Sequence, residues 1–299
     1  MKYFLLTFDV EDWFQVENFK TRIPFSSWPF CESRVERNTH TILDFLDSAR
    51  IQYFEGYHPN GTLKATFFVL GWIAERMPGL IKEIRERGHE VASHGYNHKL
   101  SNRCSGNELK EDLKQSKELL EDILGKPVLG YRAPSFSITE EALAILEECG
   151  YVYDSSYNSF SANKRHGRIK IFPNGAGISC KTRRSIYELP ISNFKFGGYT
   201  VPTGGGAYFR LIPVRLFAKM ALSVIRDQSA YLFYLHPWEA DADQPKVQDA
   251  PAFLRFRHYT NIPLTLKKLS FLLEKMKSLA FVSCSDYIQQ TAKPFEIAQ

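Results

Sequence analysis

Three carboxylates follow the first apolar run of the chain. Residues 3–8 are largely hydrophobic, and Asp9, Glu11 and Asp12 come directly after them. On an exposed turn, such a cluster is commonly a solvated acidic patch. Asp9, however, adjoins an apolar run, and a buried carboxylate needs a partner such as a metal ion or an arginine. We therefore predict that this cluster meets both kinds of partner.

Two histidines, His94 and His98, lie four positions apart after another apolar run. This spacing lets two imidazoles reach one ion from a helical turn. Neutral imidazole suits zinc, and also cobalt, nickel or iron. Two histidines with one carboxylate leave coordination positions open for water and substrate, which is typical of a catalytic metal site. The pair alone is a weak signal, but together with the acidic cluster it predicts such a site.

An arginine and a third histidine follow two further apolar runs. Arg132 is predicted to form a bidentate pair with Asp9 and to keep it ionised. Pro134 is expected to stiffen the loop after Arg132, so that a backbone N–H near Ser135 faces a developing oxyanion. His236 is predicted to act as a general acid, because histidine titrates near neutral pH.

Strands and helices alternate through the first half of the chain. Apolar patterns predict strands at 3–8, 64–70, 89–93, 128–131 and 151–153, with helices at 72–87, 107–124 and 139–148. This alternation is typical of parallel βα units, and the carboxyl ends of parallel strands all face the same way. The acids, the histidines and Arg132 are therefore expected to line one mouth.

The second half of the chain is less regular. Residues 158–206 are rich in Gly, Ser and Arg and are predicted to be a long insertion beside the site. Helical spacing resumes at 211–225, an apolar strand is expected at 231–235, and a late helix at 264–277. We expect one α/β domain over 1–299, whose part from about 158 onward supplies the last strands and helices.

Composition excludes several classes of protein. The 299 residues are 44% hydrophobic and 24% charged, which is typical of a folded globular chain. The net charge of +5 is spread along the sequence and does not favour nucleic-acid binding. Five cysteines without a Cys-x-x-Cys pair argue against a disulfide framework and a thiolate metal site. With no apparent signal peptide or transmembrane stretch, we expect a cytoplasmic protein, free or at the inner membrane face.

These motifs jointly resemble the polysaccharide deacetylases, carbohydrate esterase family 4. The resembling segments are Thr7-Phe8-Asp9, Ala65 to Val69, Gly88 to His98, Arg132-Ala133-Pro134 and Leu235-His236, and the match covers about 3–157 and 187–240. The resemblance implies a distorted (β/α) barrel of about seven parallel strands with zinc or a similar divalent ion.

The resemblance also implies roles for individual residues. Asp9 matches the general base, and Arg132 matches the residue that tethers this base. His94 and His98 match the metal ligands, and His236 matches the catalytic acid.

One position departs from the family pattern. Val10 stands where the family usually has a second aspartate that binds the metal. A sister branch that acts on peptidoglycan has this ligand two positions after the base, which selects Glu11, whereas a looped chain would present Asp12. Both carboxylates therefore remain candidates for the third ligand.

Further segments resemble a narrower bacterial subgroup encoded beside exopolysaccharide genes. They are 9–14, 204–210 and 236–239. This similarity implies a surface glycan or its lipid-linked precursor as substrate. Aromatic residues in or near these segments are candidates for stacking on sugar rings, although each could equally be core: Trp13, Phe14, Tyr208 and Trp238.

The sequence thus predicts a metal-dependent amide hydrolase that removes N-acetyl groups from amino sugars. Two alternatives stay open: a small-molecule amidase that cleaves cyclic amides or formamides, and a glycan-binding module without turnover. Intact Asp9, Arg132 and His236 disfavour the binding module. The products, acetate against formate or an opened ring, distinguish the two enzymes.

Overall fold

Parallel strands form the centre of the molecule. The computed structural model describes residues 1–54, 63–160, 165–174 and 177–292. In hydrogen-bonded order, the parallel part of the main sheet is β11-β1-β2-β3-β4-β5-β8. These strands are β11 (Ala230–Leu235), β1 (Tyr3–Val10), β2 (Ala65–Val69), β3 (Glu90–Ser93), β4 (Gly130–Tyr131), β5 (Tyr153–Asp154) and β8 (Tyr187–Glu188). The expected α/β fold with seven parallel strands is confirmed.

β1 pairs with three other strands of the sheet. It pairs with β2 on one side and β11 on the other, and near its start also with the short strand β12 (Ala280–Phe281). Every residue from Phe4 to Val10 is buried. Burial on both faces explains the continuous apolar run, because a strand covered on both faces shows no polar alternation.

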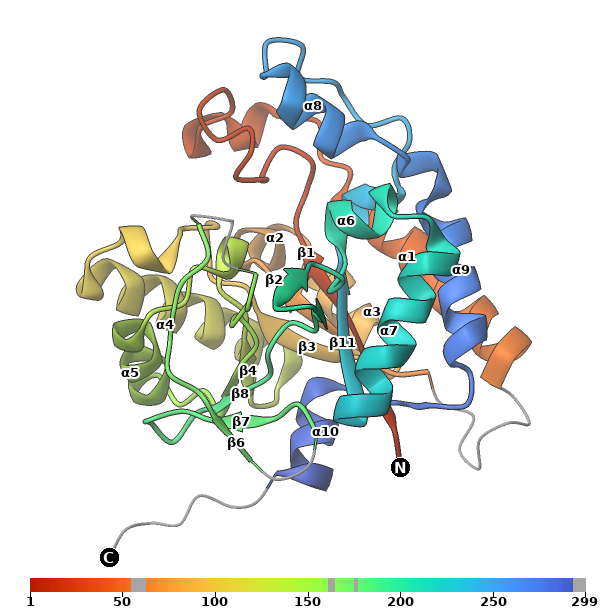
Figure 1. The fold of residues 1–299 in the computed structure, drawn as a ribbon. Helices are drawn as coiled ribbons and strands as arrows, with labels where there is room; N and C mark the ends of the chain where they lie inside the picture. The colour runs from red at the N-terminus through yellow and green to blue at the C-terminus, as the bar shows by residue number, and fades with distance from the viewer. Residues whose placement is uncertain (55–62, 161–164, 175–176, 293–299) are drawn as a thin grey trace, which may run out of the picture.

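Helices surround the sheet (Figure 1). The first half of the chain supplies α1 (Val35–Ala49), α2 (Gly71–Arg76), α3 (Pro78–Glu86), α4 (Gly106–Leu124) and α5 (Glu140–Glu148). The second half supplies α6 (Gly206–Leu211), α7 (Val214–Gln228), α8 (Ala252–Tyr259), α9 (Thr265–Met276) and α10 (Cys284–Thr291). None of the helices in the described residues is both long and apolar enough to cross a membrane.

Two predicted helices begin or end at prolines. The helix expected at 72–87 is divided into α2 and α3, because Pro78 cannot donate the hydrogen bond that would continue α2. The helix expected at 211–225 begins only at Val214, directly after Pro213. By contrast, α4 has the predicted length, from the capping box of Ser105 and Glu108 to Gly125.

The segment 158–206 is more ordered than an irregular insertion. It contains β8 of the parallel sheet, two strands antiparallel beyond it, β6 (Phe172–Pro173) and β7 (Cys180–Lys181), and a hairpin of β9 (Phe194–Phe196) and β10 (Tyr199–Val201). The described part of this segment therefore contains strands that the sequence analysis did not predict. Strands of two or three residues are too short for a periodic pattern to reveal them.

The chain after β8 reaches the far edge of the sheet. Leu232 of β11 donates its N–H to Ser192 Oγ at 2.9 Å, and Tyr234 donates to the Gly204 carbonyl at 2.8 Å. A Cβ on Gly205 would lie 1.8 Å from the Tyr234 carbonyl oxygen, so only glycine permits this approach. Loop residues thus join β11 to the region beyond β8, as a distorted barrel requires.

Candidate active site

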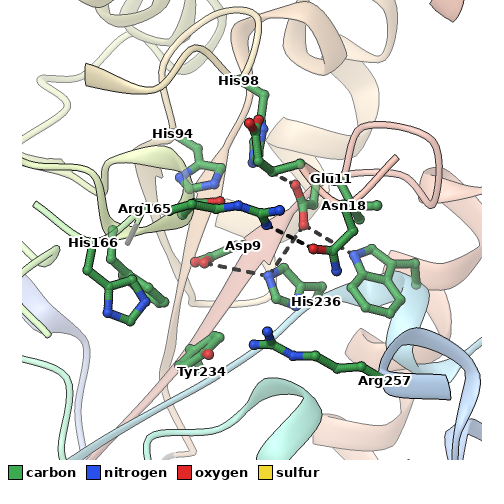
Figure 2. Close-up of a pocket in the computed structure, with 15 residues that line it drawn as sticks. Asp9, Glu11, Asn18, His94, His98, Arg165, His166, Tyr234, His236 and Arg257 are labelled. Carbon is green, nitrogen blue, oxygen red and sulfur yellow. Dashed lines mark hydrogen bonds and ion pairs between the residues drawn. The ribbon is translucent and has the colours of Figure 1, made fainter. Parts of the chain in front are cut away.

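A cavity of about 120 Å³ opens at the carboxyl ends of the parallel strands (Figure 2). It is lined by residues from β1, from the loops after β3 and β4, from the segment 158–206, and from β11, η5 (Pro237–Ala240) and α8. The predicted residues in this lining are Asp9, Glu11, His94, His98, Ser135, His236 and Trp238. The expected convergence is thus present for these residues, whereas Asp12 and Arg132 do not line the cavity.

Three buried side chains form a group that could hold a metal ion. One ligand atom each from Glu11, His94 and His98 lies within 4.8 Å of the other two. His98 Nε2 is 2.9 Å from Glu11 Oε2, yet no hydrogen bond of acceptable geometry reaches this buried oxygen within the described residues. A carboxylate oxygen and imidazole nitrogens that converge in this way match the donor set of zinc and similar ions.

The surroundings of His94 prepare it as a ligand. Its Nδ1 lies 2.7 Å from the Arg132 carbonyl, so Nδ1 carries the proton and Nε2 keeps its lone pair. Burial lowers the pKa of His94 to about 4, which keeps the ring neutral. The loop after β3 carries both histidines without a helical turn, and His98 has a left-handed backbone with φ of 54°. The two histidines therefore reach one site from a loop and not from the expected helical turn.

Asp12 lies apart from this group. Its carboxylate accepts hydrogen bonds from the backbone N–H groups of Trp13, Arg34 and Val35 and from Ser33 Oγ, at 2.7 to 3.1 Å. It therefore holds the start of α1 against the loop after β1. Of the two carboxylates that the sequence left open, the structure brings Glu11, and not Asp12, to the histidines.

Arg132 tethers Asp9 through one nitrogen. Arg132 Nη1 lies 2.6 Å from Asp9 Oδ1, and the remaining guanidinium nitrogens donate to the carbonyl and hydroxyl of Ser155. The predicted ion pair is present, but it is not bidentate, because Nε and Nη2 of the guanidinium donate to Ser155 and not to Asp9. Arg132 is fully buried, so the pair fixes the Asp9 carboxylate at the cavity floor.

His236 is held between carboxylates. Its Nε2 lies 3.3 Å from Glu11 Oε1 and 3.9 Å from Asp9 Oδ2, while its Nδ1 lies 2.7 Å from Glu239 Oε1. Burial lowers the pKa of His236, but Glu11, Glu239 and Asp9 outweigh burial and raise the pKa to about 9. The imidazole is therefore protonated at neutral pH, as a general acid must be before it donates.

Glu239 and Arg210 support His236 from behind. Both are fully buried, and Arg210 Nε lies 2.6 Å from Glu239 Oε2. Burial raises the pKa of Glu239, but Arg210 and His236 outweigh it and lower the pKa to about 2. The sequence analysis missed both residues, although Glu239 lies three positions after His236 and Arg210 lies in the glycine-rich segment 204–210.

The loop after β4 and Trp238 complete the predicted site. Pro134 is buried and is followed by left-handed backbone at Ser135 and Phe136, with φ of 52° and 59°. Ser135 lines the cavity, where its placement fits the predicted oxyanion contact. Trp238 donates from Nε1 to Glu11 Oε1 at 3.2 Å and stacks on His236, so it supports the site as well as lining it.

The other aromatic candidates have different positions. Trp13 and Phe14 are buried and pack on each other, and Phe14 also packs on Trp28 and Trp72, which makes both core residues. Tyr208 lines a smaller hollow beside the cavity.

Several cavity residues were not predicted. Arg165 and His166 come from the segment 158–206, and Arg257 comes from α8. The sequence analysis gave no role to His166, because nothing in the sequence places it after a strand. The Arg-rich composition of its segment was the only available signal. Among the other histidines, His58 lies outside the described residues, and His258 stacks on Trp238 at 4.2 Å.

Comparisons with known proteins agree with this geometry. Residues 60–153 match the family model described as polysaccharide deacetylase, and residues 155–289 match a domain of unknown function, DUF3473. The first match confirms the resemblance to the polysaccharide deacetylases, carbohydrate esterase family 4. The bacterial exopolysaccharide subgroup remains a prediction.

Curated proteins are similar to part of the chain. A peptidoglycan deacetylase of Helicobacter pylori is 33% identical over 113 residues, which are 37% of this chain and 37% of that protein. A peptidoglycan-N-acetylglucosamine deacetylase of Bacillus cereus is 32% identical over 88 residues, 29% of this chain and 41% of that protein. The matches therefore span less than half the length of either relative.

A solved structure shares the whole fold. It is described as a polysaccharide deacetylase from Mycobacterium smegmatis, with 18% identity and a TM-score of 0.58 over 99% of this chain and 93% of that chain. At this identity, the likeness shows the fold alone.

Proposed function

We propose that this protein is a metal-dependent deacetylase that hydrolyses the N-acetyl group of amino sugars in a bacterial surface polysaccharide or its precursor. The observation that carries the proposal is one cavity containing Glu11, His94 and His98 beside Asp9 and His236. The polysaccharide deacetylase match and the relatives named as peptidoglycan deacetylases support this reaction and substrate class.

Glu11, His94 and His98 would hold the ion. A bound divalent ion supplies Lewis-acid chemistry for the acetamide carbonyl and makes water more acidic. Zinc suits this set of donors best, and cobalt, nickel or iron accept similar ligands. Glu11 also contacts His236 and Trp238, so one of the proposed metal ligands lies directly beside the proposed general acid.

Asp9 and His236 divide the proton transfers. Asp9 takes the proton of the attacking water as its oxygen bonds to the acetyl carbon, while Arg132 keeps the carboxylate in place. The backbone near Ser135 stabilises the negative oxygen of the tetrahedral intermediate. His236 then gives its proton to the amine nitrogen as the carbon–nitrogen bond breaks, and acetate and a free amino sugar leave.

Both matched segments serve this reaction. Asp9 and Glu11 precede the first matched segment, His94, His98 and Arg132 lie within it, and His236 lies within the second. β11 of the second segment pairs with β1 along six residues. These contacts support a single catalytic domain over 1–299. All five cysteines lie in the described residues and none is in a disulfide, which supports the cytoplasmic location that we propose.

Acetate release tests the function. The purified, zinc-loaded protein should release acetate from N-acetylglucosamine oligomers, and neither formate from formamides nor opened rings from cyclic amides. Asp9→Asn should lower the rate by about 10²–10⁴-fold, whereas the exposed control Asp243→Asn should not change it. Formate or ring opening in place of acetate would favour the small-molecule amidase, and binding of the oligomers without any product would favour the binding module.

A further inference from the structure

Two arginines line the cavity together with the proposed metal ligands and catalytic residues. Arg165 reaches in from the segment 158–206, and Arg257 reaches in from α8 on the opposite side of His236 (Figure 2). The reaction proposed above uses neither arginine, so their placement needs another explanation.

The main chain holds Arg165 in position. The neighbouring Gly167 donates its N–H to the Phe136 carbonyl at 2.8 Å, and a Cβ on Gly167 would lie 1.6 Å from the Ile138 carbonyl oxygen. The Arg165 carbonyl accepts from Asn102, and Arg165 Nη1 donates to Asn18 Oδ1 at 2.8 Å. The segment 158–206 is thus fixed against the loop after β4 and delivers Arg165 to the cavity.

Contacts of its backbone and of the next residue hold Arg257 in position. Its carbonyl accepts from Arg210 Nη2 at 3.1 Å, and the adjacent His258 stacks on Trp238. Its guanidinium lies over the Tyr208 ring at 5.4 Å. No ion pair joins this guanidinium to a carboxylate in the part of the chain that the structure describes. Arg257 therefore brings a half-buried positive charge that the protein leaves unbalanced at close range.

The acids in the cavity are already engaged elsewhere. Asp9 pairs with Arg132, and Glu11 faces His98 and His236. Glu17 pairs with Lys20 at 3.3 Å and lies 3.8 Å from Arg103. Holding two guanidinium groups in one small cavity costs free energy, and an anion bound between them removes that cost.

The cavity also extends past the arginines. His166, Tyr234 and Arg257 line both the main cavity and a smaller hollow, whose other residues include Asn193 and Tyr208. Amide and aromatic side chains are suited to contact a sugar ring. The residues shared by the two hollows therefore mark the direction in which a neighbouring group of the substrate would extend.

We propose that Arg165 and Arg257 form a subsite for an acidic group, a carboxylate or a phosphate, close to the acetamido group of the substrate. This proposal rests on the proposed function and narrows its substrate class to acidic glycans. A carboxylate would come from a uronic acid next to the N-acetylhexosamine in a polymer, and a phosphate from a sugar phosphate of the precursor. Both are bound by guanidinium in the same way.

Two matched pairs of substrates test the proposal. The first is a hyaluronan tetrasaccharide and its carboxyl-reduced counterpart, and the second is N-acetylglucosamine 1-phosphate and the methyl glycoside of N-acetylglucosamine. The wild-type kcat/KM should favour the acidic member of at least one pair by about tenfold or more, which corresponds to ~1.4 kcal/mol. Preference in the first pair alone identifies the carboxylate, and preference in the second alone identifies the phosphate.

Five variants separate an effect of this subsite from an effect of the overall charge of the protein. Arg165→Gln and Arg257→Gln should move the ratio of acidic to neutral kcat/KM toward one, and Arg257→Lys should restore part of it. The matched controls are Arg168→Gln, on the same segment, and Arg255→Gln, on α8, and both lie outside the cavity lining. Both controls should keep the wild-type ratio. Equal rates for the members of both pairs, or a ratio that survives both cavity substitutions, would overturn the proposal.

A binding measurement separates this proposal from the function itself. If no substrate releases acetate, the proposed function fails, and calorimetric titration with the same four compounds then tests the subsite alone. Tighter binding of an acidic compound than of its neutral counterpart, weakened about tenfold in Arg257→Gln, would still support the subsite. Equal affinities would reject it independently of turnover.

Discussion

Glu239 Oε1 lies 2.7 Å from Nδ1 of His236, on the side of the imidazole that faces away from Asp9. This contact fixes the tautomer and the direction of the ring, so that Nε2 points into the cavity. Arg210 in turn donates to Glu239, so Arg210 and Glu239 together position His236, the proposed proton donor.

Glu239→Gln should therefore slow the reaction. The amide cannot stabilise the protonated imidazole as the carboxylate does, and we expect kcat to fall by about 10²-fold or more. The variant should also lose stability, because Arg210 keeps a buried charge without its partner, at a cost of about 3–5 kcal/mol. Steady-state kinetics and thermal unfolding measure the two effects.

A double variant distinguishes these effects. Adding Arg210→Met to Glu239→Gln removes the orphaned charge and should recover part of the stability without recovering kcat. If activity returns together with stability, Glu239 acts only through folding and does not position His236.

The choice between Glu11 and Asp12 can be made by metal content. Glu11→Gln should lose most bound zinc, because a catalytic site has few protein ligands to spare. Asp12→Asn should keep zinc but unfold more easily, by about 1–3 kcal/mol, since it weakens the hydrogen bonds at the start of α1. Elemental analysis and thermal melts check both expectations. Zinc loss in Asp12→Asn at a temperature where it remains folded would contradict the assignment.

Asp9→Asn completes this comparison. The proposed base is not a ligand, so the variant should retain zinc while its turnover collapses. Loss of zinc as complete as in His94→Ala would instead make Asp9 a ligand.

Metal removal should lower the melting temperature. An ion that binds only the folded state adds stability that grows with its concentration, about 4 kcal/mol at a thousand times its dissociation constant. We expect a chelator to lower the midpoint by several degrees, at roughly 2–4 °C per kcal/mol for large domains, and zinc to restore it. Glu11→Gln should show no such shift, and an equal shift in both proteins would place the ion elsewhere.

Glu188 and Asp154 should make stability depend on pH. Burial raises the pKa of Glu188 well above its ordinary value, and Asp154 on the adjacent strand raises it further. Above pH 4.5, the ordinary value for Glu188, the unfolded chain loses this proton while the folded chain keeps it. Stability should therefore fall as pH rises, by up to about 1.4 kcal/mol per pH unit, until the folded pKa is reached.

Glu188→Gln removes this dependence. The amide oxygen can still accept from the Ser156 and Tyr157 N–H groups that Glu188 Oε1 now serves. Denaturant unfolding from pH 5 to 9 should give a flatter curve for the variant than for the wild type. Parallel curves would show that the pair holds no extra proton.

Much of the fold could be predicted from the sequence because the first strands and helices carry clear local signals. β1 is a fully apolar strand, and α4 has both its capping box and its terminal glycine. The residue types indicated the metal-ligand group, but they could not decide between Glu11 and Asp12. The structure decides because the Asp12 carboxylate accepts hydrogen bonds from backbone N–H groups 22 and 23 residues further along the chain.

Other parts of the site could not be predicted. Glu239 and Arg210 pair across 29 positions, and Arg165 reaches the cavity only because Gly167 packs against Ile138. Such contacts depend on tertiary packing, which neither periodicity nor local spacing encodes.

The pairing of β1 with β11 has a consequence for how the protein is made. β1 leaves the ribosome long before β11, a neighbour that is synthesised more than two hundred residues later, and Thr7 donates to the Phe233 carbonyl in the finished sheet. At 5–20 residues per second, this delay is on the order of ten seconds or more. During that time an apolar strand has one open edge, so nascent chains stalled or truncated before β11 should aggregate or engage chaperones. Asp9 and Glu11 can meet His236 only once β11 has been synthesised.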